Sequence, residues 1–441
     1  MTARVLRSGI ASADAPHVTG GSGAELILSD GRRVIDAMTT PAPLGHRHPR
    51  LVEAVAEAVR SSPTLDEGWV TADREAAADE LLTTAFAGEN SWVGAVRFAV
   101  TGSEANDLAL SLCQALTGRR PLVTRERGYH GTVGLARDVT VQSQWHGGLT
   151  GTDGAVRPVP RSVPVRALPF PAGKLGSGLT LSREAAREVL AAAGPLVHDA
   201  AAVIIDYSQG GRYAAPAYQD ELAGMARAAG ALWVADEVVT GFGKCGRWFN
   251  FQWGESRPDI VTLGKPMGGG VAPVAAVVVS RRVLDMMGDS AWQSYSALRA
   301  HPTAIAAARA FVRTVEEDNL VDRAHSLNSV IAARMAVLAS RHPIVQRIDG
   351  LGLHWWIDLH PSAEETGPSS ADRVAAAVLE AGVMVATSGE ESAVLVTLPM
   401  IISDGQLETV LQALDHGLAA AVPGLASASA GRAGACGDHG R

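Results

Sequence analysis

An aspartate and a lysine each stand where a short apolar segment of this 441-residue chain gives way to glycine-rich sequence. Residues 231–235 lead into Asp236, and residues 259–264 lead into Lys265. Short runs rich in β-branched residues and bounded by glycines are typical of buried strands. In a parallel α/β sheet, ligands bind at the carboxyl ends of the strands. We therefore expect the side chains of Asp236 and Lys265 to face one ligand.

An amine and a carboxylate in this arrangement suit one cofactor chemistry. The lysine can form a Schiff base with an aldehyde. The carboxylate can hold a ring nitrogen in its protonated form, which makes the ring an electron sink. Asp236 and Lys265 therefore predict a site for pyridoxal 5′-phosphate. Taken alone, the two residues leave open an ordinary strand-end acid and an unrelated surface lysine.

A candidate phosphate site lies earlier in the chain. A predicted strand at 95–100 runs directly into Gly102 and Ser103, which begin a predicted helix. Glycine lets the backbone approach an anion closely, and the unpaired N–H groups of a helix start attract phosphate. The alternative is a plain serine cap. Tyr129 follows the next predicted strand, where its ring could stack on a flat ligand or simply pack in a loop.

The composition excludes several classes of protein. The net charge of −8 argues against nucleic acid and against an anionic membrane surface as partners. Three scattered cysteines suggest neither disulfides nor a zinc site, and we expect a reducing, cytoplasmic location. We expect no signal peptide and no membrane span. His46 and His48 lack suitably spaced partners, so no metal is expected.

The order of elements predicts an α/β protein. Strands at 95–100, 201–207 and 231–235 alternate with helices, which favours a mostly parallel sheet with helices on both faces. A hairpin at 23–37 precedes this region. Residues 147–178, rich in glycine, proline and serine, are expected to form a long loop.

Strands and helices that follow residue 344 indicate a second, smaller domain. A final helix is predicted at 405–420. Residues 424–441 are rich in alanine, glycine and serine without a periodic apolar face, and we expect a disordered tail there.

Four motifs in a fixed order resemble those of the class III (subgroup II) aminotransferases, pyridoxal-phosphate enzymes of fold type I. They are TGSEAND, YHG, VADEVVTGFGKCGRWF and PDIVTLGKPMGGG. The resemblance covers nearly the whole chain. It implies a large domain with a seven-stranded-type, mostly parallel sheet between helices, and a smaller α+β domain built from both chain ends. The implied ranges are 1–55 joining the small domain, 56–315 as the large domain and 316–423 as the small domain.

The resemblance also implies a role for each matching residue. Lys265 matches the Schiff-base lysine and Asp236 the partner of the ring nitrogen. Val238 and Tyr129 match the residues on the two faces of the ring. Gly102 and Ser103 match the phosphate site. Members of the family are usually homodimers whose partner subunits complete each active site, so a homodimer is expected here.

The chain departs from the family at positions that contact substrate and partner. The threonine that family members donate to the partner's phosphate falls at Ala297, so either the adjacent Ser296 replaces it or one donor is lost. The run 393–399 lacks the arginine that clamps a substrate carboxylate. Arg212 or Arg299 could recognise that carboxylate instead.

Two further departures stand at strand ends. Asp206 and Tyr207 replace the usual Glu-Pro pair, and Asp349 replaces an arginine.

Three functions therefore stay open. The first is transfer of an amino group between a small-molecule amine or amino acid and a carbonyl acceptor. The second is a repurposed site that performs another step: an amino shift, elimination or replacement, decarboxylation or carbon–carbon bond formation. The third is a catalytically silent binding protein, against which the intact Lys265 and Asp236 argue. The sequence names neither amino donor nor acceptor.

Overall fold

The computed structural model describes residues 16–142, 145–150, 155–170, 181–208, 213–360, 369–388 and 392–421. The predicted tail at 424–441 and the candidate Arg212 lie outside these residues.

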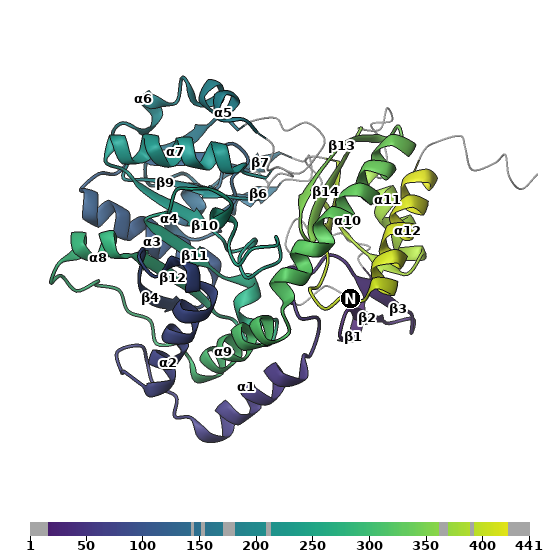
Figure 1. Cartoon of the computed structure of the whole chain (residues 1–441), viewed down its shortest axis with the longest axis horizontal. Helices are drawn as coiled ribbons and strands as arrows, with labels where there is room; N and C mark the ends of the chain where they lie inside the picture. Colours follow the sequence, from purple (N-terminus) through teal and green to yellow (C-terminus); the bar gives the residue numbers. More distant parts are fainter. Residues whose placement is uncertain are drawn as a thin grey trace, which may run out of the picture.

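A seven-stranded sheet forms the centre of the larger body (Figure 1). Its strands, in spatial order, are β4 (Val93–Ala99), β12 (Ala275–Ser280), β11 (Ile260–Leu263), β10 (Leu232–Asp236), β9 (Ala202–Asp206), β5 (Leu122–Arg125) and β8 (Val165–Leu168). Only β12 runs antiparallel to its neighbours, β11 and β4. The remaining pairs are parallel, which confirms the mostly parallel sheet expected from the sequence.

Alternate residues of each strand point to opposite faces of the sheet, and helices bury the apolar side chains on both faces. Ile204 and Val234 pack with α3 (Gly102–Thr117) and α8 (Arg281–Met287). Ile205 and Ala235 face the other way, toward α5 (Arg183–Leu190) and α7 (Pro216–Ala229). The strands are apolar throughout, as expected for a sheet buried on both faces.

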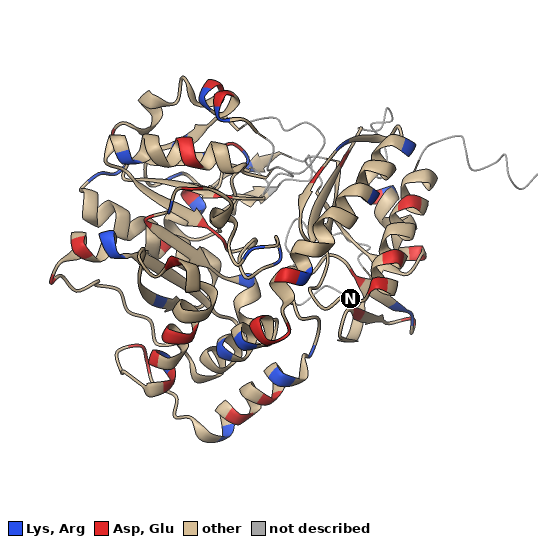
Figure 2. Ribbon diagram, viewed as in Figure 1, with Lys and Arg blue, Asp and Glu red and all other residues tan. Residues whose placement is uncertain are grey.

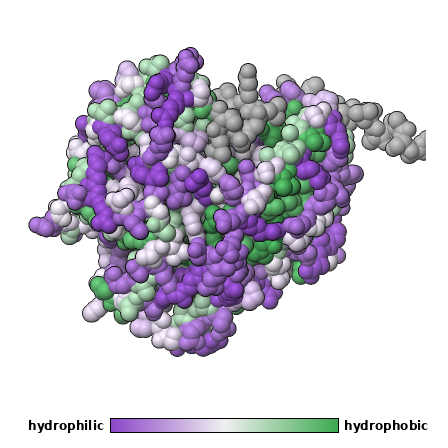
Figure 3. All heavy atoms as spheres, in the orientation of Figure 1, coloured by the Kyte–Doolittle hydropathy of each residue, from purple (hydrophilic) through white to green (hydrophobic). Residues whose placement is uncertain are grey.

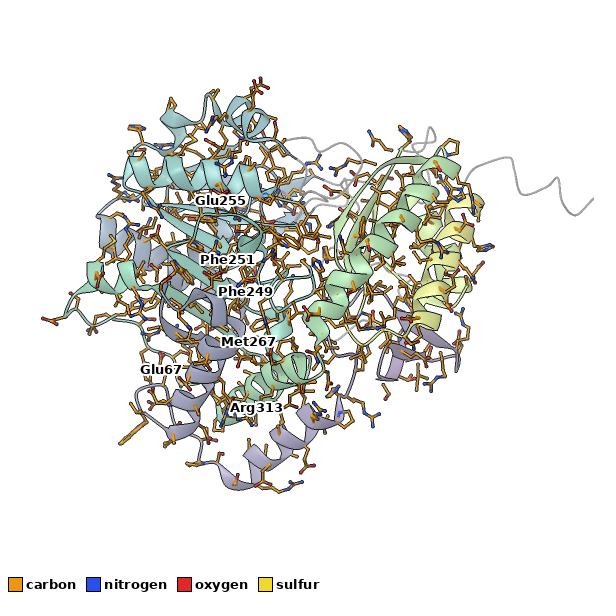
Figure 4. All side chains as sticks on the ribbon, viewed as in Figure 1. Glu67, Phe249, Phe251, Glu255, Met267 and Arg313 are labelled. Atoms are coloured by element: carbon orange, nitrogen blue, oxygen red, sulfur yellow. The ribbon has the colours of Figure 1, made fainter. Side chains whose placement is uncertain are left out.

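Three further helices lie below the sheet in Figure 1: α1 (Pro49–Ser61), α2 (Ala72–Glu80) and α9 (Pro302–Glu317). Proline stands in the first turn of α1 and of α9, where the N–H group that it lacks would have no intrahelical acceptor. An aromatic cluster closes the same side, where Phe86 stacks on Phe249 at 4.2 Å between ring centroids and Phe249 stacks on Phe251 at 5.7 Å (Figure 4).

A smaller body joins segments from both ends of the chain (Figure 1). One of its sheets combines β1 (Val18–Ser22), β2 (Glu25–Leu28) and β3 (Arg33–Asp36) with β15 (Val383–Met384). The other contains β13 (Val345–Leu351), β14 (His354–Leu359), β17 (Ala393–Thr397) and β16 (Ala386–Ser388). Helices α10 (Leu320–Arg341), α11 (Ser370–Glu380) and α12 (Asp404–Ala420) pack beside these strands. The β2–β3 hairpin and the last helix confirm two sequence predictions; the exact domain limits stay predictions.

The loop predicted at 147–178 contains three short strands that the sequence analysis missed: β6 (Leu149–Thr150), β7 (Val156–Arg157) and β8. Strands β6 and β7 pair antiparallel with each other. Strand β8 pairs parallel to β5 and forms the edge of the central sheet. Its four residues, flanked by prolines, are too short to show a period, and only the neighbouring strand supplies their hydrogen bonds.

Charged residues of both signs lie along surface helices such as α1, where Arg60 contacts Glu53 and Glu57 (Figure 2). Apolar surface in the same view gathers over the smaller body, in the region of α10 (Figure 3). No helix of the described residues is long and apolar enough to span a membrane. Within the same residues, no group of three or more potential ligand side chains could hold a metal ion.

Candidate active site

A cavity of about 460 Å³ opens at the carboxyl ends of the central strands. Asp206 comes from the end of β9, Asp236 from the end of β10, and Lys265 from the turn that follows β11. These three strands are parallel neighbours, so their ends meet at one edge of the sheet. The volume lies within the range of about 300–1,000 Å³ typical of small-molecule sites.

Asp236 and Lys265 both line this cavity, as the sequence predicted. Burial lowers the pKa of Lys265, while the negative charges of Asp236 and Asp206 act in the opposite direction. A lower pKa increases the fraction of neutral amine, which is the form that attacks a carbonyl carbon or takes up a proton. Lys265 is therefore a competent nucleophile and base.

A buried hydrogen-bond network fixes the carboxylate of Asp236. Its Oδ2 accepts from Nδ2 of Asn106 at 2.7 Å and lies 2.7 Å from Nδ1 of His130. The N–H group of Val238 donates to Oδ1 at 3.0 Å. These three contacts fix the position of the carboxylate at the edge of the sheet.

Two members of this network, Asn106 and His130, were not assigned a role from the sequence. Asn106 is held in turn by Thr262, whose hydroxyl donates to its Oδ1 at 2.5 Å, and Thr124 Oγ1 lies 3.0 Å from Nε2 of His130. His130 stands in the YHG motif, which drew attention only to its tyrosine. Asn106 lies one helical turn after Gly102, and that spacing was the available signal.

The predicted phosphate site lies at the N-terminus of α3. Helix geometry leaves the N–H groups of Gly102 and Ser103 without intrahelical acceptors, and both residues line the cavity. A Cβ atom at Gly102 would lie 2.4 Å from Cγ1 of Val238, and one at Gly131 would lie 2.5 Å from Oγ of Ser103. Both positions need glycine. The backbone therefore forms an open cradle suited to an anion.

Tyr129 and Val238 also line the cavity. Trp145 packs edge-on against the Tyr129 ring, with centroids 5.4 Å apart. Burial, with the nearby Asp236 carboxylate, raises the pKa of Tyr129 and keeps its phenol neutral. The chain thus provides an anion cradle, a fixed carboxylate, a buried amine and two apolar walls, which together fit a phosphorylated pyridine aldehyde. Trp69, by contrast, is 62% exposed and does not line the cavity.

Ser296, predicted as a phosphate ligand, does not line the cavity of its own subunit. Its N–H group donates to Oε1 of Glu67 at 2.5 Å. Arg299, one candidate for substrate recognition, is 6% exposed and donates to Glu67 at 2.9 Å and to Glu104 at 2.7 Å. Its charge is already neutralised, so the structure argues against that candidate.

The sequence profile of the family "Aminotransferase class-III" matches residues 11–418 of this chain. The acetylornithine aminotransferase of Streptomyces coelicolor is 32% identical over 372 residues, which covers 83% of this chain and 82% of that protein. The ethanolamine-phosphate phospho-lyase homolog 1 of Caenorhabditis elegans is 27% identical over 412 residues, covering 87% of this chain and 84% of that protein.

A solved structure agrees with these sequence relatives. The S-selective transaminase from an Arthrobacter species superposes with a TM-score of 0.82 at 28% identity, over 94% of this chain and 95% of that one.

Proposed function

This chain belongs to the class-III aminotransferases, and on that premise we propose which of its residues carry the reaction and what it acts upon. The protein is a pyridoxal-phosphate-dependent transferase that moves an amino group between small molecules. One observation supports the assignment of its catalytic residues: Lys265 and Asp236 line the same cavity from neighbouring parallel strand ends.

Each part of the cofactor has a matching group in the cavity. The N–H groups of Gly102 and Ser103 would hold the phosphate at the start of α3. Tyr129 and Val238 would cover the two faces of the ring, and the carboxylate of Asp236 would meet the ring nitrogen. When bound, pyridoxal phosphate supplies an aldehyde that condenses with amines and a ring that accepts electrons.

The chain's own side chains supply the remaining chemistry. Asp236, held in place by Asn106, His130 and the N–H group of Val238, would hold a proton at the ring nitrogen. Nζ of Lys265 would move the proton at the substrate carbon that bears the amino group. The apolar walls exclude water from these steps.

A second candidate reaction is elimination. One relative carries the name of a phospho-lyase, and the carboxylate-clamping arginine of the family is absent from β17. Elimination would use the same Lys265, which removes a proton next to the carbon that loses its leaving group.

We also propose a homodimer and a cytoplasmic location. The loops at 62–71 and 289–301 lack regular secondary structure yet are held by ion pairs from Glu67 to Arg97 at 3.0 Å and to Arg299 at 2.9 Å (Glu67 is labelled in Figure 4). They expose Trp69, Tyr295 and Leu298. Apolar side chains on firmly held loops favour a protein interface, and Ser296 in the same loop could reach the partner's phosphate. Both described cysteines are free thiols, as expected in a reducing compartment.

Absorbance spectroscopy with a panel of amines tests the proposal. The loaded protein should show the absorbance of lysine-bound cofactor, and an amino donor should convert it to the pyridoxamine form. Lys265→Ala should lose covalent attachment after borohydride reduction, measured by mass spectrometry. Retention of attached cofactor and turnover in that variant would refute the assignment of Lys265. Release of inorganic phosphate from a phosphorylated amine, without pyridoxamine, would favour elimination.

A further inference from the structure

A second buried lysine lies close to the candidate active site. Lys244 stands in the loop that follows β10, where Phe242, Gly243 and Gly246 all have positive φ angles of 67°, 93° and 84°. Phe242 is a bulky, fully buried residue in a conformation that side chains rarely adopt. Strain of this kind persists where the surrounding structure demands it, often at ligand sites. The loop thus holds Lys244 in a costly, defined position.

The ammonium of Lys244 has no partner among the residues that the structure describes. The side chain is 1% exposed, and its Nζ makes no hydrogen bond. The carboxylate that acts on its pKa is Asp36, which already binds His46 at 2.8 Å and accepts two backbone N–H groups. A buried charge without a counter-ion is unfavourable. Burial lowers the pKa of Lys244 to about 8, so at neutral pH much of it is still charged.

His354, at the start of β14, adds a second unsatisfied donor. Its Nδ1 lies 3.1 Å from Oγ1 of Thr397, and its Nε2 has no partner among the described atoms. Burial and the charges of Lys244 and Lys265 lower the pKa of His354 to about 3, so the ring is neutral. Nδ1 can accept from the Thr397 hydroxyl, which leaves Nε2–H as an unused donor. His354 directly follows Leu353, whose N–H group donates to the carbonyl oxygen of Lys244, so His354 lies beside the Lys244 loop.

Backbone contacts fix this arrangement. The N–H group of Leu353 donates to the carbonyl oxygen of Lys244 at 3.0 Å. A Cβ atom at Gly352 would lie 2.2 Å from the same oxygen, so the two chain segments touch closely. The loop carrying Lys244 and the β13–β14 turn next to His354 thus form one contact between the two bodies.

Among the residues that the structure describes, the basic groups that line the cavity are His130, which contacts Asp236, and Lys265, which is proposed to hold the cofactor. We propose that Lys244, with His354 beside it, binds an anionic group, such as a carboxylate or sulfonate, on the amine that this enzyme uses as substrate. The inference rests on the proposed function and names its substrate class.

Lys244 does not line the cavity as it stands. Lysine carries its charge on a flexible four-carbon stem, so the ammonium can extend toward an entering anion. The charge pair formed there would replace the missing arginine of β17 as the group that orients the substrate.

Binding of unreactive anions to the loaded enzyme tests this proposal. Calorimetry should show that propane-1-sulfonate binds at least tenfold more tightly than propan-1-ol. Lys244→Met should remove that preference, and Lys244→Arg should retain it. Cofactor absorbance and melting temperature, recorded for each variant, report whether the protein is loaded and folded.

The pH profile separates recognition from a merely structural role. In the native enzyme the affinity for propane-1-sulfonate should fall by about tenfold per pH unit above pH 8, as Lys244 loses its proton. Two other groups that act on Lys244 keep their charge state over that range. Asp36 stays ionised because its pKa is lowered, and Cys245 stays protonated because its pKa is raised to about 12. His354 stays neutral, and Lys265 is occupied by cofactor. Lys244→Arg should abolish the fall up to pH 9.5.

Two results would overturn the proposal: equal binding of the sulfonate and the alcohol by the native enzyme, or an unchanged pH profile in Lys244→Arg. The pH profiles of native enzyme and Lys244→Arg decide the matter even if Lys244→Met does not fold. Failure of the proposed function would appear elsewhere, as cofactor that does not attach to Lys265.

Discussion

Nδ2 of Asn106 donates to Oδ2 of Asp236 across 2.7 Å, and the same amide also donates to the carbonyl oxygen of His130 at 2.7 Å. Asn106 is 1% exposed, so this hydrogen bond to a buried charge has no competition from water. Such bonds contribute about 1.5–3 kcal/mol. Asn106 therefore positions the carboxylate that is proposed to hold the ring nitrogen in its protonated form.

Asn106→Leu should lower kcat/KM by about 10- to 100-fold, because it removes a charge-assisted hydrogen bond at nearly constant volume. The pH dependence of the absorbance of bound cofactor should also differ from that of the native enzyme. The reason is that Asp236, which would hold the proton on the ring nitrogen, loses the hydrogen bond from Asn106. Thr262→Val removes only the contact that orients Asn106 and should cost less than tenfold. Equal activity of Asn106→Leu and native enzyme would contradict the role given to Asn106.

Gly102→Ala should weaken cofactor binding. The new Cβ would lie 2.4 Å from Cγ1 of Val238, a stiff side chain that lines the same cavity. Overpacking of this kind costs about 1–3 kcal/mol, and a loss of that size in binding would raise the dissociation constant of pyridoxal phosphate by about 5- to 150-fold. Fluorescence titration of the cofactor-depleted protein with pyridoxal phosphate measures this dissociation constant.

The matched control is Gly224→Ala in α7, where an added Cβ meets no atom within 4 Å. It should leave cofactor affinity unchanged and stabilise the helix by about 0.5–1 kcal/mol. An equal effect of Gly102→Ala and Gly224→Ala on the affinity for pyridoxal phosphate would show that the close packing of Gly102 against Val238 does not matter for cofactor binding.

Asp349→Asn should stabilise the protein at pH 8 but not at pH 4. Burial raises the pKa of Asp349 from 3.8 to about 6 in the folded state. Near pH 4 and below, folded Asp349 is protonated and costs little. As the pH rises from about 4 to about 6, ionisation favours the unfolded chain, and above that range the full penalty of about 3 kcal/mol applies. Asparagine keeps an acceptor for the N–H group of Tyr213 without the charge.

Melting temperatures of both proteins across pH 4–8 test this expectation. The difference between Asp349→Asn and native protein should grow with pH and level off above pH 6. A constant difference over the whole range would show that Asp349 does not titrate as described.

Leu298→Glu should dissociate the proposed dimer. Leu298 is 62% exposed and stands with Tyr295 on a loop held by the Glu67 ion pairs. A charge in a buried apolar contact costs several kcal/mol. Light scattering should therefore show a monomer, and activity should fall if the partner completes each site.

Val337→Glu on α10 provides the comparison, since Val337 is 47% exposed on the body where Figure 3 shows apolar surface. It should leave the dimer intact. Dissociation by this substitution alone would move the interface to α10.

The sequence by itself predicted most of the central elements and the two strand-end residues, Asp236 and Lys265, that line the cavity. β-branched runs and glycines place Asp236 and Lys265 after strands, and these signals are local: they depend on backbone preferences and on the two-residue period of a strand. The cradle at Gly102 and Ser103 was likewise visible as a strand that runs into a helix.

Tertiary structure decided which side chains meet. Asn106 lies 130 residues from Asp236, and Glu67 lies 232 residues from Arg299. No local pattern encodes such pairs, because they depend on how strands and loops from distant parts of the chain pack together. The same holds for Lys244, whose Nζ lacks a hydrogen-bond partner among the described residues because of how the surrounding segments pack.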